Sequence, residues 1–117
     1  MNSTKNIKPE YKELKISDIP DGKGIVVDIY PEDRLISVII TRVGEQISGF
    51  HNICSHAGWR LDTDDGVLLF DDAGDIICSG HCAAFSGKDG SFLGGPGKGK
   101  PLRKYPLVIE GETIIVR

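Results

Sequence analysis

The sequence lacks the features that mark several large classes of protein. No stretch approaches the ~20 apolar residues that a membrane-spanning helix needs, and residues 1–10 have no apolar core of the kind found in secretion signals. We therefore expect a cytoplasmic protein with no membrane partner. Basic residues are not in excess either, since the net charge is −3 and the pI is near 5.5. Nucleic acid is thus not an expected partner.

Helical periodicity is also missing, because no segment keeps a 3.6-residue apolar period over ten or more residues. Short runs rich in β-branched residues take its place, and turn-forming residues separate them. The predicted strands cover residues 11–16, 24–30, 35–41, 46–50, 66–70, 75–78, 105–109 and 113–116. With 15 glycines and 6 prolines for loops and turns, the chain is predicted to be all-β.

The length of 117 residues suits one domain with a buried core. Residues 1–10 are polar and are predicted to form a flexible N-terminal segment. Residues 11–117 are predicted to form a single domain, in which residues 51–97 make a loop-rich ligand lobe set on sheets from both ends of the chain.

Cysteine and histidine are scarce, with three of each, yet two of each fall into a paired pattern. The pairs are Cys54-Ser-His56 and Cys78-Ser-Gly-His81, with 21 residues between His56 and Cys78. In a reducing compartment such cysteines are expected to be ligands or free thiols rather than disulfides. Two thiolates and two imidazoles suit either a tetrahedral zinc or a [2Fe–2S] cluster with one histidine-held iron. The adjacent Cys82 is an alternative ligand to Cys78.

The residues around both pairs add to this pattern. The motifs are Cys54-Ser-His-Ala-Gly-Trp-Arg-Leu61, Cys78-Ser-Gly-His-Cys-Ala-Ala-Phe85, Asp89-Gly90 and Gly94-Gly-Pro96. In these motifs the chain resembles the Rieske iron–sulfur family, although its gap between the pairs is longer than usual. The resemblance implies a Rieske-like antiparallel β-sandwich or barrel with a loop-rich cluster-binding lobe.

The resemblance also implies roles for individual residues. Cys54 and Cys78 would bind one iron of a Rieske [2Fe–2S] cluster, and His56 and His81 the other. Three further residues would shield or close over the cluster: Trp59, Phe85 and Pro96.

Some positions depart from the high-potential members of the family. Those members carry a disulfide between the two loops, at positions that are Trp59 and Gly80 here. They also use a serine and a tyrosine hydroxyl as hydrogen-bond donors to the cluster, at positions that are Ala83 and Phe85 here. Lost hydrogen bonds to the sulfurs lower the potential, so we predict a value near the bottom of the Rieske range of ~−150 to +300 mV.

A small domain of this kind resembles the ferredoxin components of aromatic-ring oxygenase systems. It would take single electrons from a flavoprotein reductase and pass them to a terminal oxygenase, with no catalytic residue of its own. An oxygenase also needs a mononuclear iron site, for which His51 is the one histidine left. Two alternatives stay open: a small subunit of a larger reductase such as nitrite reductase, and a structural zinc module that binds a protein partner.

Charge is unevenly spread along the chain. Six aspartates fall within residues 62–75, whereas residues 88–104 hold five basic residues and one aspartate. Such asymmetry can orient a protein partner during encounter.

Overall fold

The computed structural model describes residues 9–53, 69–71, 74–77, 83–94 and 100–117. Within these ranges the regular structure is antiparallel β-strand with two single-turn 3-10 helices, which confirms the all-β prediction. The elements are β1 (Lys12–Lys15), η2 (Ile16–Asp18), β2 (Lys23–Ile29), η3 (Pro31–Asp33), β3 (Ile36–Val43), β4 (Gln46–His51), β5 (Leu69–Phe70), β6 (Ile76–Ile77), β7 (Ala84–Phe85), β8 (Phe92–Gly94), β9 (Val108–Glu110) and β10 (Thr113–Val116). No helix in the described part of the chain is long and apolar enough to cross a membrane.

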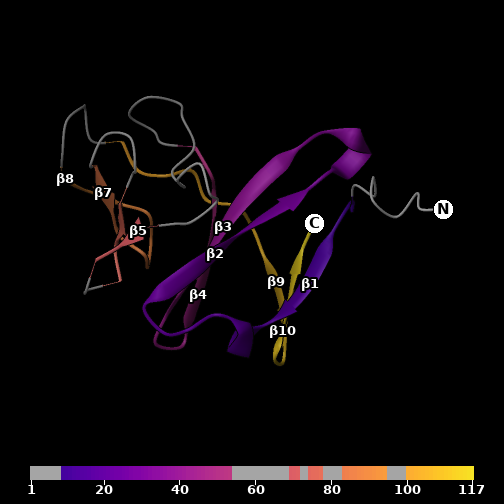
Figure 1. Ribbon diagram of the computed structural model, residues 1–117, viewed down its shortest axis with the longest axis horizontal. Helices are drawn as coiled ribbons and strands as arrows, with labels where there is room; N and C mark the ends of the chain where they lie inside the picture. The colour runs from indigo at the N-terminus through magenta and orange to yellow at the C-terminus, as the bar shows by residue number, and fades with distance from the viewer. Residues whose placement is uncertain (1–8, 54–68, 72–73, 78–82, 95–99) are drawn as a thin grey trace.

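The strands form three sheets, with the orders β1-β10-β9, β2-β3-β4 and β5-β6-β7-β8. Figure 1 shows the sheet of β2, β3 and β4 between the other two. Two tight turns set much of the register: Val43 pairs with Gln46 across Gly44-Glu45, and Glu110 pairs with Thr113 across Gly111-Glu112. Two-residue turns with glycine at the first central position suit the right-handed twist of paired strands.

The middle sheet is buried on both faces, which explains why β3 has a continuous apolar run. Successive side chains of a strand point to opposite faces. Ile39 of β3 belongs to one hydrophobic cluster, with Phe50 of β4 and Ile76 of β6. Its neighbours Val38 and Ile40 belong to a second cluster, with residues of β10. The molecule therefore has two hydrophobic cores, one on each face of β2-β3-β4.

A buried threonine ties the middle sheet to the turn that follows β7. Thr41 has no exposed surface, and its Oγ1 donates a hydrogen bond of 2.6 Å to the carbonyl of Gly87. A buried hydroxyl without an acceptor would cost free energy, so this bond fixes the turn on β3.

Gly90 in the same turn is constrained both by its backbone and by the core. Its φ is +77°, and a Cβ placed there would lie 2.6 Å from Cε1 of Phe50. We predict that Gly90→Ala lowers the free energy of unfolding by about 2–4 kcal/mol, from left-handed strain plus overpacking. Urea unfolding measures the loss.

Gly111 provides the matched control for Gly90. Its φ is +63°, but a Cβ there would meet nothing within 4 Å. Gly111→Ala should cost only the strain of about 1–2 kcal/mol. Equal losses in the two variants would show that contact with Phe50 is not what restricts residue 90.

Candidate metal centre

The structure describes residues that flank the predicted ligands in the sequence, but not the predicted ligands themselves. The predicted site residues outside the described ranges are Cys54, His56, Trp59, Cys78, His81 and Pro96. Phe85 alone among the predicted site residues is described. Among the described residues, no group of three or more histidine, cysteine, aspartate or glutamate side chains is placed to hold a metal.

The predicted ligands lie on two stretches, residues 54–56 and 78–81, which are named the first and second donor segments. The residues that flank these segments pack into a single hydrophobic cluster. Phe50 lies four residues before Cys54, and Ile76 lies two residues before Cys78. Ala83, two residues after His81, belongs to the same cluster, and all three flanking residues are fully buried. Phe50 and Ile76 lie 26 residues apart in the sequence, so no local structure joins them. It is this core that anchors the chain next to both pairs of predicted ligands.

A hairpin holds the two ends of the second donor segment. Ile76 pairs with Phe85 and Ile77 pairs with Ala84 in antiparallel register. Paired residues of such a ladder lie only about 5 Å apart. Cys78 directly follows Ile77, and His81 precedes Ala84 by three residues. The described hairpin therefore holds Ile77 and Ala84, which flank the predicted ligands Cys78 and His81 in the sequence, close together.

A polar network fixes the chain just before the first donor segment. The buried Asn52 donates from its backbone N–H to the carbonyl of Ser37 (2.9 Å) and from Nδ2 to the Ser37 hydroxyl (3.2 Å). The Ser37 hydroxyl in turn donates to Oδ1 of Asp28 at 2.6 Å. Sequence reasoning missed Asn52, since an asparagine after a strand is usually an exposed turn residue.

His51 is the last residue of β4, so this strand extends one residue beyond the predicted range of 46–50. Its ring packs edge-on against Tyr105 with ring centroids 5.1 Å apart, and its backbone N–H donates to the carbonyl of Arg103. Partial burial, and secondarily the charge of Arg103, lower the pKa of His51 from the ordinary value of 6.5.

The lowered pKa of His51 predicts a stability loss in acid. Because the folded pKa lies below the unfolded one, the unfolded chain binds more protons between the two values. Stability is therefore full above about pH 6.5 and falls as the pH drops through the folded pKa. Urea unfolding midpoints at several pH values measure this slope. His51→Gln should flatten it, and an unchanged slope would assign it to other groups.

Phe85 lies where the second donor segment returns to the core. Its ring is fully buried and contacts Phe92 of β8 edge-on, with centroids 5.8 Å apart. Ala83 is also fully buried. Neither side chain carries a hydroxyl, so neither can donate a hydrogen bond to a group held by the donor segments.

The donor chemistry fits a [2Fe–2S] cluster with mixed ligands. Two cysteines and two histidines are the complement that such a cluster takes when histidines hold one iron. Fully buried apolar residues lie four residues before Cys54 and two residues before Cys78, and an apolar shell is one of the factors that tune such a centre.

Comparisons with known proteins point the same way. The family model of the Rieske [2Fe-2S] domain matches residues 10–106. The chain is 28% identical over 102 residues to the cytochrome b6-f complex iron-sulfur subunit of Chlorobaculum thiosulfatiphilum, covering 87% of this chain and 50% of that protein. It is 27% identical over 106 residues to the biphenyl dioxygenase ferredoxin subunit of Pseudomonas sp. (strain KKS102), covering 90% of this chain and 88% of that one.

A solved structure extends the similarity to the fold. The ferredoxin of carbazole 1,9a-dioxygenase from Nocardioides aromaticivorans IC177 superposes with a TM-score of 0.64 at 27% identity, covering 88% of this chain and 91% of that one. The chain thus spans half the length of the first relative and most of the two ferredoxins. The cofactor of the matched family is a Rieske [2Fe–2S] cluster. The chain belongs to the Rieske [2Fe-2S] domain family.

Proposed function

We propose that this protein is a low-potential electron carrier whose [2Fe–2S] cluster is held by Cys54, His56, Cys78 and His81. The observation that carries the proposal is the shared core: Phe50, Ile76 and Ala83 flank the two donor segments and lie in one buried cluster. When bound, a Rieske cluster supplies reversible one-electron chemistry.

The chain's own residues would perform three tasks around the cluster. Cys54 and Cys78 would hold one iron as thiolates, while ring nitrogens of His56 and His81 would hold the other. Buried apolar residues such as Phe85 would keep water from the inner side. Trp59 and Pro96 would shield the rest, and the two histidines would form the path by which electrons reach a partner.

The proposed partners are a flavoprotein reductase as donor and the terminal oxygenase of an aromatic-ring system as acceptor. Support comes from the similarity to two ferredoxins, one of a biphenyl and one of a carbazole dioxygenase, over most of their length. The cytochrome b6-f subunit matches over only half of its length. Trp59 and Gly80 also stand where the resemblance places the disulfide cysteines of quinol-oxidising members. The cytoplasmic location remains part of this proposal.

Stopped-flow mixing tests the partner directly. The dithionite-reduced protein, freed of excess dithionite, is mixed with the oxidised terminal oxygenase of the biphenyl system and, separately, of the carbazole system. We expect at least one of them to reoxidise the carrier with one electron per chain. If neither oxygenase accepts electrons while the carrier still cycles reversibly at an electrode, the oxygenase assignment is wrong and a subunit of another reductase becomes the better interpretation.

Restoring a hydroxyl next to the second donor segment should raise the potential. Ala83→Ser adds a donor at a fully buried position two residues after His81. A hydrogen bond to the cluster of about 1 kcal/mol would stabilise the reduced form by on the order of 50 mV for a one-electron couple. Spectroelectrochemical titration measures the shift.

Ala84→Ser is the control for that substitution. Residue 84 adjoins Ala83 in sequence but is only partly buried, and side chains at successive strand positions point to opposite faces. Ala84→Ser should therefore leave the reduction potential of the cluster unchanged. If Ala83→Ser leaves the potential unchanged as well, the missing hydroxyl at residue 83 is not what sets the potential.

A further inference from the structure

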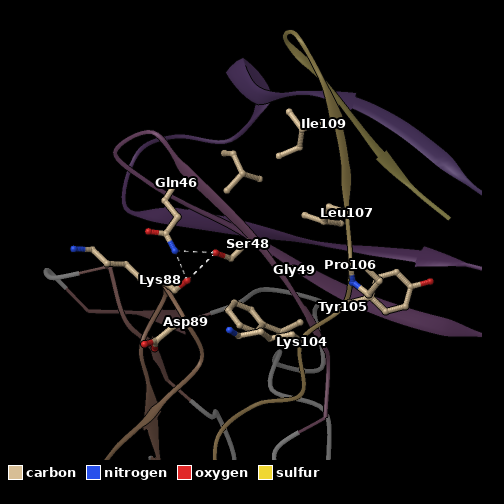
Figure 2. Close-up of a pocket in the computed structure, with 12 residues that line it drawn as sticks. Gln46, Ser48, Gly49, Lys88, Asp89, Lys104, Tyr105, Pro106, Leu107 and Ile109 are labelled. Carbon is tan, nitrogen blue, oxygen red and sulfur yellow. Dashed lines mark hydrogen bonds between the residues drawn. The ribbon is translucent and has the colours of Figure 1, made fainter.

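A slot opens where β4 and the segment leading into β9 diverge. The two run side by side as far as Gly49, whose carbonyl accepts a hydrogen bond of 2.8 Å from the N–H of Tyr105. Pro106 follows, and beyond it a cavity of about 460 Å³ separates the strands. Figure 2 shows Leu107 and Ile109 on one side of this slot and Gln46 on the other.

The β4 wall of the slot presents unpaired backbone groups. Hydrogen-bonded pairs alternate along antiparallel strands, and a two-residue turn makes Val43 and Gln46 such a pair. Residues 47, 49 and 51 therefore direct their N–H and C=O groups away from β3. The carbonyl of Gly49 accepts a hydrogen bond from the N–H of Tyr105, and the N–H of His51 donates one to the carbonyl of Arg103. In the described part of the chain, the N–H and C=O of Ile47 have no such partner.

Hydrogen-bonded pairs also alternate along β9, which forms the other wall of the slot. Glu110 and Thr113 form the hydrogen-bonded pair beside the second two-residue turn, so Ile109 directs its N–H and C=O away from β10. β9 is the edge strand of its sheet, and Leu107 directly precedes it in the chain. Neither residue makes an outward backbone hydrogen bond within the described residues. An edge of this kind is a template for another strand.

We propose that an extended, acidic segment of a partner protein adds as a strand to the outer edge of β9 within this slot. The edge offers backbone groups from Leu107 and Ile109, and Ile47 faces them from the opposite wall. Ile109 is 45% exposed, so an apolar side chain of the added strand would cover it. Main-chain pairing would provide affinity and the side-chain contacts specificity, as in other strand-addition complexes.

Charge at one end of the slot selects the acidic partner. Lys88, Asp89 and Lys104 line the slot at the end away from Ile109 (Figure 2). The Asp89 carboxylate already accepts the N–H of Ser91, whereas both lysines are exposed. The net positive end therefore favours an acidic residue where the added strand passes it.

Hydrogen bonds between β4 and the 86–90 turn fix one wall of the slot in place. The Lys88 carbonyl accepts hydrogen bonds of 2.7 Å from both Nε2 of Gln46 and the hydroxyl of Ser48. These bonds join β4 to the 86–90 turn. A partner strand would thus enter a site that needs little rearrangement, which lowers the cost of binding.

The first test uses the peptide acetyl-Thr-Val-Thr-Val-Glu-Asp-amide and the cluster-loaded protein. We expect saturable binding by calorimetry, with slower amide exchange at Leu107 and Ile109. The same peptide N-methylated at both valines cannot donate these backbone hydrogen bonds, and its affinity should fall about tenfold or more. No binding at about 1 mM, or equal affinity of the two peptides, would overturn the proposal.

Matched charge variants test the acidic preference. Lys88→Glu/Lys104→Glu should weaken peptide binding about fivefold at low salt, and less at high salt. Lys12→Glu/Lys23→Glu makes the same change of net charge on β1 and β2 and should leave affinity unaltered. Equal weakening in both double variants contradicts the site, as does sedimentation showing that a second copy of the chain fills the slot. The visible spectrum of the cluster reports independently on the proposed function.

Discussion

Cys78→Ser should abolish the cluster, leaving less than about a tenth of the iron of the parent protein. A serine hydroxyl is a poor substitute for a thiolate, which is the form of cysteine that binds iron. The loss would remove the visible absorption and all reversible one-electron chemistry. Iron and sulfide analysis of the purified variant, with its absorption spectrum, provides the measurement.

Cys82→Ser is the matched control, because it removes the neighbouring thiol four residues along the chain. We expect this variant to keep its full iron content and spectrum. The reverse result, with iron lost from Cys82→Ser and kept in Cys78→Ser, would transfer the ligand role to Cys82. It would also break the two-residue spacing between cysteine and histidine on which the family resemblance rests.

Phe85→Ala should cause the largest loss of stability among the core substitutions considered. Phe85 is fully buried, packs against Phe92 and pairs with Ile76 beside the second donor segment. Replacing a buried phenylalanine by alanine removes about 3–5 kcal/mol. The melting temperature should fall by about 12–20 °C, with the cluster lost at the same transition.

Leu93→Ala is the control for Phe85→Ala, because it tests whether the loss of stability depends on burial of the side chain or only on its position near Phe92. Leu93 follows Phe92 on β8 but is 52% exposed, so its truncation should cost less than about 1 kcal/mol. If Leu93→Ala is as damaging as Phe85→Ala, the buried cluster around Phe85 is not the part of the fold that supports the donor segments.

Long β-branched runs made parts of the fold predictable. The strands expected at 24–30 and 35–41 are observed as Lys23–Ile29 and Ile36–Val43. Ile16 was placed in the first strand, but it begins a 3-10 turn in which the Asp18 carboxylate accepts the N–H of Lys15. Local side-chain hydrogen bonding of this kind competes with strand formation and leaves no periodic signal.

Strands that depend on distant partners were less predictable. β7 and β8 were not predicted, because two or three residues are too few to show an alternating pattern. A strand was expected over 105–109, yet β9 begins at Val108, after Pro106. The bond from Thr41 to Gly87 joins residues 46 positions apart, so no local pattern could reveal it.

For the candidate site, too, some features could be predicted from the sequence and others could not. The sequence alone leads to the predicted ligands, because few other arrangements of two cysteines and two histidines suit a metal, and the family match agrees with the predicted cofactor. The anchoring of both donor segments in one core could not, since Ile39, Phe50 and Ile76 come from three separate strands. Ligand roles, shielding residues and the domain boundaries at residues 1–10 and 51–97 remain predictions.

Electron paramagnetic resonance of the dithionite-reduced protein, with iron, sulfide and zinc measured on the same sample, is the most direct test of the histidine-ligated cluster. We predict a rhombic signal, with two irons and two sulfides per chain and no zinc. A silent spectrum with about one zinc per chain and no sulfide would contradict the electron-carrier proposal and leave a structural zinc module.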